Sequence, residues 1–269
     1  MVTVTIFGLL TACAGAPAQS PLAFGVLGDV PYDDEEIRRL DRMIDDMNGE
    51  RLDFVVHLGD IGSSKLACND AWLDARKRQL ARLKVPVLVI PGDNEWSDCR
   101  EPARRLAAWR KRFCKAPFPV EVQRGEYCEH LRWEQAGFLF VSVHTVGGNN
   151  NLRRDPEETA RRMEAAHAWL DESAVLARLR GRTLVILTQA NPFIVVPRDG
   201  FLGLRERLIR LGQIMPGRVF LLHGDTHIYH DDEPLPGVRR LEVWGSPVVS
   251  WIRAEAEGPE LRFSAPRYR

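Results

Sequence analysis

Short apolar runs alternate with amphipathic stretches along most of the 269-residue chain. The runs have the length and near-continuous hydrophobicity of buried strands, and they cover residues 22–27, 54–58, 85–90, 138–143, 184–187 and 219–222. Between them, apolar residues recur with helical spacing over residues 35–47, 71–83, 102–113, 157–179 and 201–211. Strands that alternate with helices predict an α/β protein with a buried, largely parallel or mixed sheet.

Two further segments differ from this pattern. Residues 238–263 contain short β-like runs separated by glycine and proline, which is typical of antiparallel strands. Residues 115–133 are predicted to be an insertion. Because the chain shows no internal repeat, low-complexity tract or long linker, residues 22–269 are predicted to form a single domain.

The first residues have the composition of a leader. They are apolar and small, with no charged residue before Asp29, and they are too short to span a membrane. Leu10-Thr11-Ala12-Cys13 resembles the bacterial lipoprotein signal box, in which the cysteine is lipidated, whereas Ala16-Pro17-Ala18 would suit an ordinary signal peptidase. We expect residues 1–18 to be a signal or lipoprotein leader, and the protein to be periplasmic or lipid-anchored to the bacterial envelope.

The cysteines agree with export. Without Cys13, four remain, and no Cys or His spacing suggests a zinc site, so disulfides are expected. Three pairings are possible. We favour Cys68 with Cys99, which both closely follow strands that carry polar motifs, and Cys114 with Cys128, which bracket one short segment.

The charge balance limits the partners. The 37 acidic and 37 basic side chains are interspersed, so nothing in the electrostatics favours nucleic acid or an anionic membrane. We expect a monomer that meets a membrane only through a lipid anchor.

Polar clusters follow the predicted strands. In open α/β sheets, ligands bind where the loops at the carboxyl ends of the strands converge. The clusters are Gly28-Asp29, Gly59-Asp60, Gly92-Asp93-Asn94-Glu95, Thr188-Gln189-Ala190-Asn191-Pro192 and Gly224-Asp225-Thr226-His227.

In order and position, these five clusters resemble the motifs of the calcineurin-like metallophosphoesterases: D-x-H, G-D-x-x-D, G-N-H-[DE], a loop histidine and G-H-x-H. The resemblance implies a β-sandwich of mixed sheets flanked by helices. It also implies metal-dependent hydrolysis of a phosphomonoester or phosphodiester of a small or nucleotide-like substrate.

The same resemblance assigns the metal ligands. A first metal would be held by Asp29, Asp60 and His227, and a second by Asp60, Asp93, Gln189 and Asp225. Several histidines of the family pattern are replaced here, and Pro31 stands at the first of them. The resulting oxygen-rich shells favour one or two Mg²⁺, Mn²⁺ or Ca²⁺ ions over Zn²⁺.

Four converging aspartates repel one another unless cations compensate them. The competing interpretation is a polar rim that basic residues such as Lys65 or Arg100 neutralise.

The catalytic assignment is where the chain departs most from the family. Asn94 stands at the position of the catalytic histidine, and an amide donates a hydrogen bond but supplies no proton at neutral pH. Asn94 and His227 are therefore the catalytic candidates, with His144, His223 and His230 as possible substitutes. The alternative function is a catalytically degenerate, metal- or ligand-binding periplasmic protein of the same fold.

Two further segments are candidates for substrate contacts. In the stretch HTVGGNNNL, Asn149 and Asn150 offer amide donors that, with Asn94, would bind substrate, although a plain turn explains the same residues equally well. Trp96, beside the acidic cluster, would form a wall of the site.

Overall fold

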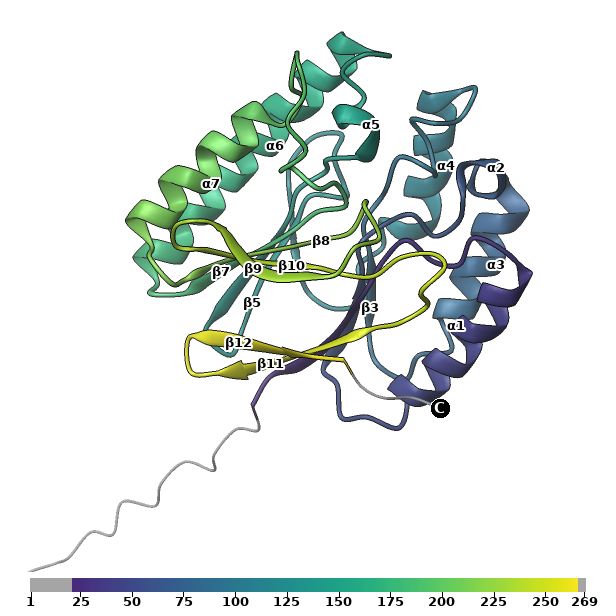
Figure 1. Ribbon diagram of the computed structural model, residues 1–269, viewed down its shortest axis with the longest axis horizontal. Coiled ribbons are helices and arrows are strands. Elements are labelled where there is room, and N and C mark those ends of the chain that lie inside the picture. The colour runs from purple at the N-terminus through teal and green to yellow at the C-terminus, as the bar shows by residue number, and fades with distance from the viewer. Residues whose placement is uncertain (1–20, 266–269) are drawn as a thin grey trace, which may run out of the picture.

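A computed structural model describes residues 21–265. Within this range, two mixed β-sheets stack face to face, with helices on their outer faces (Figure 1). This confirms the predicted fold class, an α/β sandwich of mixed sheets flanked by helices.

The first of these sheets has five strands among the described residues. In spatial order they are β12 (Glu260–Ser264), β11 (Ile252–Glu257), β1 (Ala23–Leu27), β2 (Phe54–His57) and β3 (Val87–Val89). β1, β2 and β3 run parallel, whereas β11 pairs antiparallel with both β1 and β12.

The second sheet has seven strands within the same residues. In spatial order they are β4 (Glu121–Val122), β5 (Leu131–Gln135), β6 (Phe138–Ser142), β7 (Thr183–Leu187), β8 (Val219–His223), β10 (Val238–Glu242) and β9 (His230–Leu235). The run from β6 to β10 is parallel, and antiparallel strands close both edges.

The core between the sheets is aromatic at its centre. Phe24 stacks on Phe54 within the first sheet, with ring centroids 4.8 Å apart, and both rings meet Phe140 of the second sheet edge-on. All three side chains are buried, so the two inner faces share one apolar layer.

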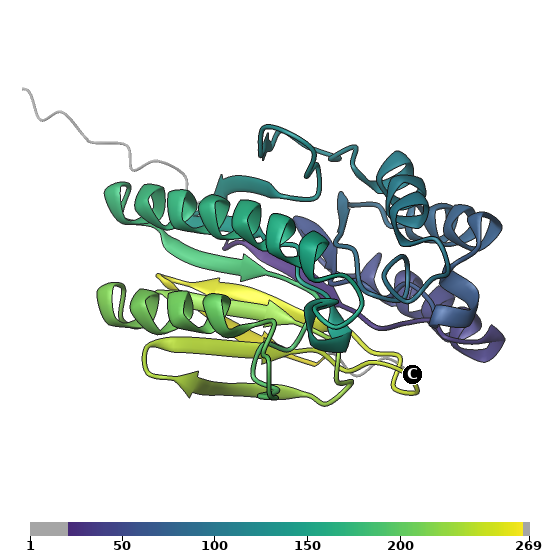
Figure 2. The same cartoon turned by 90° about the horizontal axis from the view of Figure 1, so that it is seen from above.

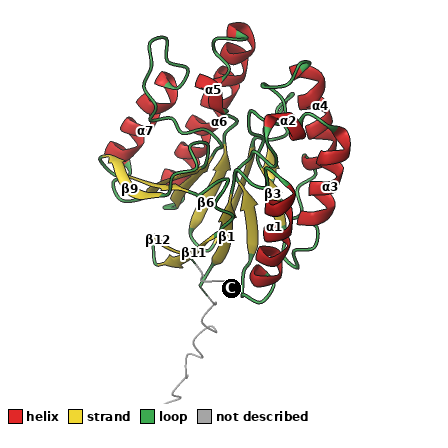
Figure 3. Cartoon of the chain, turned by 45° about the vertical axis from the view of Figure 1, so that its right-hand side comes forward, coloured by secondary structure: helices red, strands yellow, loops and turns green. Residues whose placement is uncertain are grey.

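The helices cover the outer faces of the sandwich (Figures 1 and 2). α6 (Pro156–Leu179) and α7 (Leu202–Ile214) pack on the seven-stranded sheet, and α1 (Asp34–Met47) packs on the five-stranded one. The helices α2 (Ser64–Ala67), α3 (Asp70–Leu80) and α4 (Pro102–Phe113) lie on the same side as α1 (Figure 3). The four-residue element α5 (Gly147–Asn150) is a tight turn in which Gly148 and Asn149 have left-handed φ and ψ.

The predicted insertion at residues 115–133 extends too far. Its last residues belong to β5, which pairs with β6 and buries Trp133 in the core between the sheets. The charged Arg132 hid this strand from a pattern based on apolar runs. In the fold, the Arg132 guanidinium lies over the Trp169 ring and pairs with glutamates on either side.

Both favoured cysteine pairs are joined in the structure. Cys68 bonds to Cys99 and Cys114 to Cys128, with Cα atoms 5.6 and 5.5 Å apart. The predicted leader, including Cys13, lies outside the described residues. Among the described residues, no helix is long and apolar enough to cross a membrane.

Candidate metal centre

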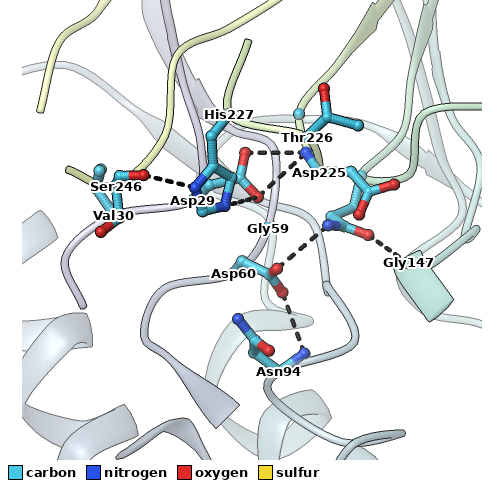
Figure 4. A network of polar contacts seen from close by, with 12 residues as sticks. Asp29, Val30, Gly59, Asp60, Asn94, Gly147, Asp225, Thr226, His227 and Ser246 are labelled. Atoms are coloured by element: carbon cyan, nitrogen blue, oxygen red, sulfur yellow. Dashed lines mark hydrogen bonds and ion pairs between the residues drawn. The ribbon is translucent and has the colours of Figure 1, made fainter. Parts of the chain in front are cut away.

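The predicted aspartates follow parallel strands of both sheets, and three of them, Asp29, Asp60 and Asp225, are seen close together in Figure 4. Asp29 follows β1 and Asp60 follows β2, and both have a φ of 54°. Asp225, after β8, has a φ of 87°. Non-glycine residues rarely occupy this left-handed region, and they cluster at functional sites when they do.

Glycines of one motif make room for aspartates of another. A Cβ atom at Gly92 would lie 1.9 Å from Oδ1 of Asp60, and one at Gly224 would lie 2.1 Å from Oδ2 of Asp29. A Cβ atom at Gly147 would lie 2.7 Å from carboxylate oxygens of both Asp93 and Asp225. The acidic cluster can pack this tightly only because side chains are absent at these three positions.

Backbone N–H groups hold three of the carboxylates in place. The N–H of Asp225 donates to the Asp29 carboxylate at 3.1 and 3.2 Å, and the N–H of Asn94 donates to Asp60 at 3.1 Å (Figure 4). The N–H of Asn191 donates to Asp225 at 2.9 Å. The acids are thus oriented by the backbone of neighbouring loops.

The carboxylates raise one another's pKa values. Burial raises the pKa of Asp225 to about 7 and that of Asp93 to about 6, with nearby carboxylates adding to both shifts. The pKa values of Asp29 and Asp60 are raised well above normal, first by burial and then by the charges of Asp225 and Asp93 respectively. The charged forms of these carboxylates are therefore disfavoured without a cation, and a bound cation would relieve their repulsion.

Basic side chains do not account for the cluster. Lys65 and Arg100, the residues that the competing interpretation invoked, are both exposed. The largest electrostatic effects on Asp29, Asp60 and Asp225 come from other carboxylates. This arrangement suits a bound cation better than a neutralised polar rim.

His227 has the tautomer that a metal ligand at Nε2 requires. Its Nδ1 lies 2.6 Å from the carbonyl oxygen of Ser246, which can only accept, so Nδ1 carries the proton. The Nε2 lone pair consequently faces the acids, 4.0 Å from Oδ1 of Asp29. Fixing a histidine tautomer through its second nitrogen is the usual arrangement at metal sites.

The donor set fits hard divalent cations in its chemistry, because it offers several carboxylates and one imidazole. The donor atoms lie near one another but do not converge on a single point. Within the described residues, no three acidic or histidine side chains of the cluster bring ligand atoms within 4.8 Å of one another. The group that does so contains the disulfide of Cys114 and Cys128, which excludes it as a metal site.

Gln189 lies at the predicted position but is turned away from a ligand's orientation. Its Nε2 donates to Oδ2 of Asp60 at 3.3 Å, and its Oε1 accepts from the N–H of Gly147 at 2.9 Å. A cation that took Oε1 as a ligand would compete with Gly147.

Tyr32 is a site residue that the sequence reasoning missed. Its hydroxyl accepts from Nδ2 of Asn94 at 2.9 Å and donates to Asp60 at 3.3 Å. The hydroxyl also lies 3.4 Å from Nε2 of His227. Its position three residues after Asp29 was the available signal, and it places a phenol among both catalytic candidates and the central aspartate.

Glu95 also has a role that the motif alone did not reveal. Its buried carboxylate accepts from the N–H groups of Gly92 and Asp60, at 2.7 and 3.3 Å, and from that of Ile61. It ties the loop after β2 to the loop after β3. Burial raises the pKa of Glu95 to about 7.

The predicted substrate contacts of Asn149 and Asn150 do not fit the structure. Asn150 is buried, and its amide bonds to Arg162 and to the carbonyl oxygen of Gly200. The Asn149 amide bonds to backbone atoms of Arg198 and Gly200. Because both amides fasten two loops together, neither is free to bind a substrate.

The three possible substitutes and Trp96 make their contacts outside the aspartate cluster. His144 is buried and bonds to Glu129 at 2.8 Å, and His230 bonds to Glu242 at 2.9 Å. Burial lowers the pKa of His223 to about 3. Trp96 packs with Leu106 and Val146 instead of walling the acidic cluster.

The two stacked sheets, the order of the five motifs and the acidic cluster are together those of a metallophosphoesterase. The chain belongs to the calcineurin-like phosphoesterase family, whose sequence profile matches residues 22–229. A comparison with curated protein sequences gives no significant match.

Solved structures of the same fold include a dimetal phosphatase from Danio rerio, with 15% identity and a TM-score of 0.64 over 91% of this chain and 96% of that one. A second is the purple acid phosphatase PPD1 of yellow lupin, with 14% identity and a TM-score of 0.60 over 91% of this chain and 52% of that one. A third is GAP50 of Plasmodium, described as the anchor in the inner membrane complex, with 12% identity and a TM-score of 0.61 over 92% of this chain and 84% of that one. At such identities the likeness shows the fold alone.

Proposed function

We propose that this protein is an exported, metal-dependent phosphoesterase that hydrolyses a phosphomonoester or phosphodiester of a small molecule. The observation that carries the proposal is the convergence of Asp29, Asp60, Asp93 and Asp225 at one edge of the sandwich, with raised pKa values and no basic side chain among the largest effects. Membership of a phosphoesterase family agrees with it.

One or two divalent cations, with Mg²⁺, Mn²⁺ or Ca²⁺ preferred to Zn²⁺, would be held by the four aspartates and His227, with Gln189 able to join after releasing Gly147. When bound, such ions supply Lewis-acid activation of the phosphoryl group and of the attacking water. Asp60 belongs to both predicted ligand groups, so both would depend on it.

The remaining chemistry belongs to Asn94, Tyr32 and His227. The Asn94 amide donates to the Tyr32 hydroxyl, which fixes its orientation beside Asp60. From there, Asn94 can stabilise negative charge on a phosphoryl oxygen through a hydrogen bond but cannot protonate a leaving group. We therefore propose that the enzyme favours esters whose leaving groups depart without protonation.

The alternative is a degenerate protein of the same fold that binds a ligand or metal without turnover. Two observations favour it: Asn94 at the position of an acid catalyst, and the Gln189 oxygen already bonded to Gly147. A neighbour of this fold, GAP50, is described as an anchor.

Asp60→Asn distinguishes the two functions. Wild-type protein is assayed with Mn²⁺, or with EDTA, against aryl phosphomonoesters and phosphodiesters, and metal content is measured on both proteins. The enzyme predicts metal-dependent hydrolysis that Asp60→Asn abolishes, together with a loss of bound metal. Asn94→His is the complementary variant and should raise activity toward poor leaving groups, because it restores a proton donor. If wild type hydrolyses none of these esters and Asp60→Asn keeps its metal, the degenerate binding protein is the correct function.

Export is the second part of the proposal. Its support is the apolar leader at residues 1–18 and the two disulfides, which persist in oxidising compartments such as the periplasm.

A further inference from the structure

A cavity of about 370 Å³ opens directly beside the metal-binding candidates. Asp225 is one of its lining residues, and the others are Gly148, Asn149, Arg153, Ile194, Val196 and Phe201. A larger cavity of about 500 Å³, bordered by residues such as Trp96, has none of the candidate ligands among its lining residues. The smaller cavity is therefore the one placed to receive the part of a substrate that projects from the acids.

The walls of this cavity are held in position before any ligand binds. The loop between β7 and α7 lies beside α5 (Figure 1), and the Asn149 and Asn150 side chains fasten it there. The three hydrogen bonds, from Asn149 to Arg198, from Gly200 to Asn149 and from Asn150 to Gly200, each measure 2.9 Å. A preformed pocket loses little conformational entropy on binding.

The same loop meets the acids at its start. The N–H of Asn191 donates to Asp225, and Ile194 follows three residues later. The apolar wall and the proposed metal ligand therefore belong to one connected unit.

The chemistry of the walls is apolar with one positive charge. The Ile194 side chain is 47% exposed, although large aliphatic side chains gain free energy from burial. Arg153 is exposed and, among the described residues, has no hydrogen-bond or ion-pair partner. A ligand group that covers the isoleucine and reaches the guanidinium would satisfy both.

We propose that this cavity, the Ile194 pocket, binds the organic group that is esterified to the phosphate of the substrate, called the ester group below. This group is apolar, about the size of an aromatic ring, and carries an anionic substituent. The proposal rests on the proposed function, because the phosphoryl group must lie at the acids for its ester group to reach the pocket. A volume of about 370 Å³ accommodates a ring-sized group but not a long polymer.

The test measures binding without turnover. Methylphosphonate, phenylphosphonate and 4-carboxyphenylphosphonate are titrated into the Mn²⁺-loaded protein by calorimetry. We expect phenylphosphonate to bind about tenfold more tightly than methylphosphonate, because the ring covers apolar wall, and the carboxylated compound to bind several-fold more tightly again. Ile194→Ser should remove most of the advantage of the ring while leaving methylphosphonate binding unchanged. Arg153→Ala should remove only the advantage of the carboxylate.

Matched controls lie elsewhere on the surface. Ile214→Ser changes an equally exposed isoleucine at the end of α7, and Arg161→Ala changes an exposed arginine of α6; neither should alter the ratios. Equal binding of methylphosphonate and phenylphosphonate, or ratios unchanged by Ile194→Ser, would overturn the pocket while leaving the proposed function intact. If no phosphonate binds to the metal-loaded protein, the proposed function fails and the pocket's role fails with it.

Discussion

Asp225→Asn should change stability in opposite directions with and without metal. The substitution keeps the size of the side chain and an oxygen to accept from the Asn191 N–H, but it removes one negative charge from the acidic cluster. In the metal-free protein this charge is unfavourable, because burial and the neighbouring carboxylates raise the pKa of Asp225 to about 7.

The magnitude follows from the size of this pKa shift. A rise from 3.8 to about 7 corresponds to a ceiling of about 4 kcal/mol at pH 7.5. Asp225 is only partly buried, so screening by solvent reduces the expected gain to about 2 kcal/mol. The metal-free Asp225→Asn protein should therefore be more stable than wild type by that amount.

The direction of the Asp225 pKa shift also determines how stability depends on pH. A carboxyl group with a raised pKa is held neutral by the fold, so its contribution to stability is fully present below pH 4 and is lost as the pH rises through about 7. Metal-free wild type should lose stability across this window, and the Asp225→Asn protein should lose less.

Bound metal should make wild type more stable than the Asp225→Asn protein, which is the reverse of their order without metal. At a free Mn²⁺ concentration one hundred times its dissociation constant, binding stabilises wild type by about 2.7 kcal/mol. The variant lacks a ligand and should gain much less. Urea unfolding in EDTA and in Mn²⁺, at pH 5 and 7.5, measures all of these effects.

The control is Asp171→Asn, which changes an exposed carboxylate paired with Arg207 and should respond to neither metal nor pH in this way. The reasoning is refuted in one of two ways. A less stable metal-free Asp225→Asn protein would show that the cluster is not under repulsion, and equal stabilisation of both proteins by Mn²⁺ would show that Asp225 is not a ligand.

Three further predictions use other parts of the structure. Tyr32→Phe removes the acceptor that orients Asn94, so kcat should fall about tenfold, the effect of one lost hydrogen bond, while metal analysis shows unchanged content; an unchanged kcat would exclude a positioning role. In a competition titration, Mg²⁺ or Mn²⁺ should occupy the carboxylate-rich site in preference to Zn²⁺, and tight stoichiometric Zn²⁺ uptake at these residues would contradict the ligand assignment. Mature protein isolated from an oxidising compartment should show no titratable thiol after denaturation, whereas four thiols would contradict both disulfides.

The order of strands and helices was readable from the sequence because buried strands in a parallel sheet are nearly continuous apolar runs. For the same reason, the Gly-Asp pairs could be placed at one edge: each follows such a run, and the ends of parallel strands meet there. The disulfide pairing was also predicted, since Cys68 and Cys99 follow neighbouring strands β2 and β3. Strand β5 escaped because Arg132 is buried there by pairing and stacking, which no local pattern reveals.

The identities of the side chains that touch within the site depended on the tertiary structure. Local sequence determines where a loop begins, but the packing of one loop on another determines what its side chains meet. The sequence suggested that the Asn149 and Asn150 amides are free donors, but in the structure they form hydrogen bonds with Gly200 in the loop before α7. The only sequence signal for Tyr32 was its position three residues after Asp29. It enters the site because the turn after β1 brings its hydroxyl to Asn94 and Asp60, residues that follow two other strands. The sequence by itself thus determined the fold and the set of candidate acids, whereas contacts between loops distant in sequence decided which polar groups remain free for chemistry.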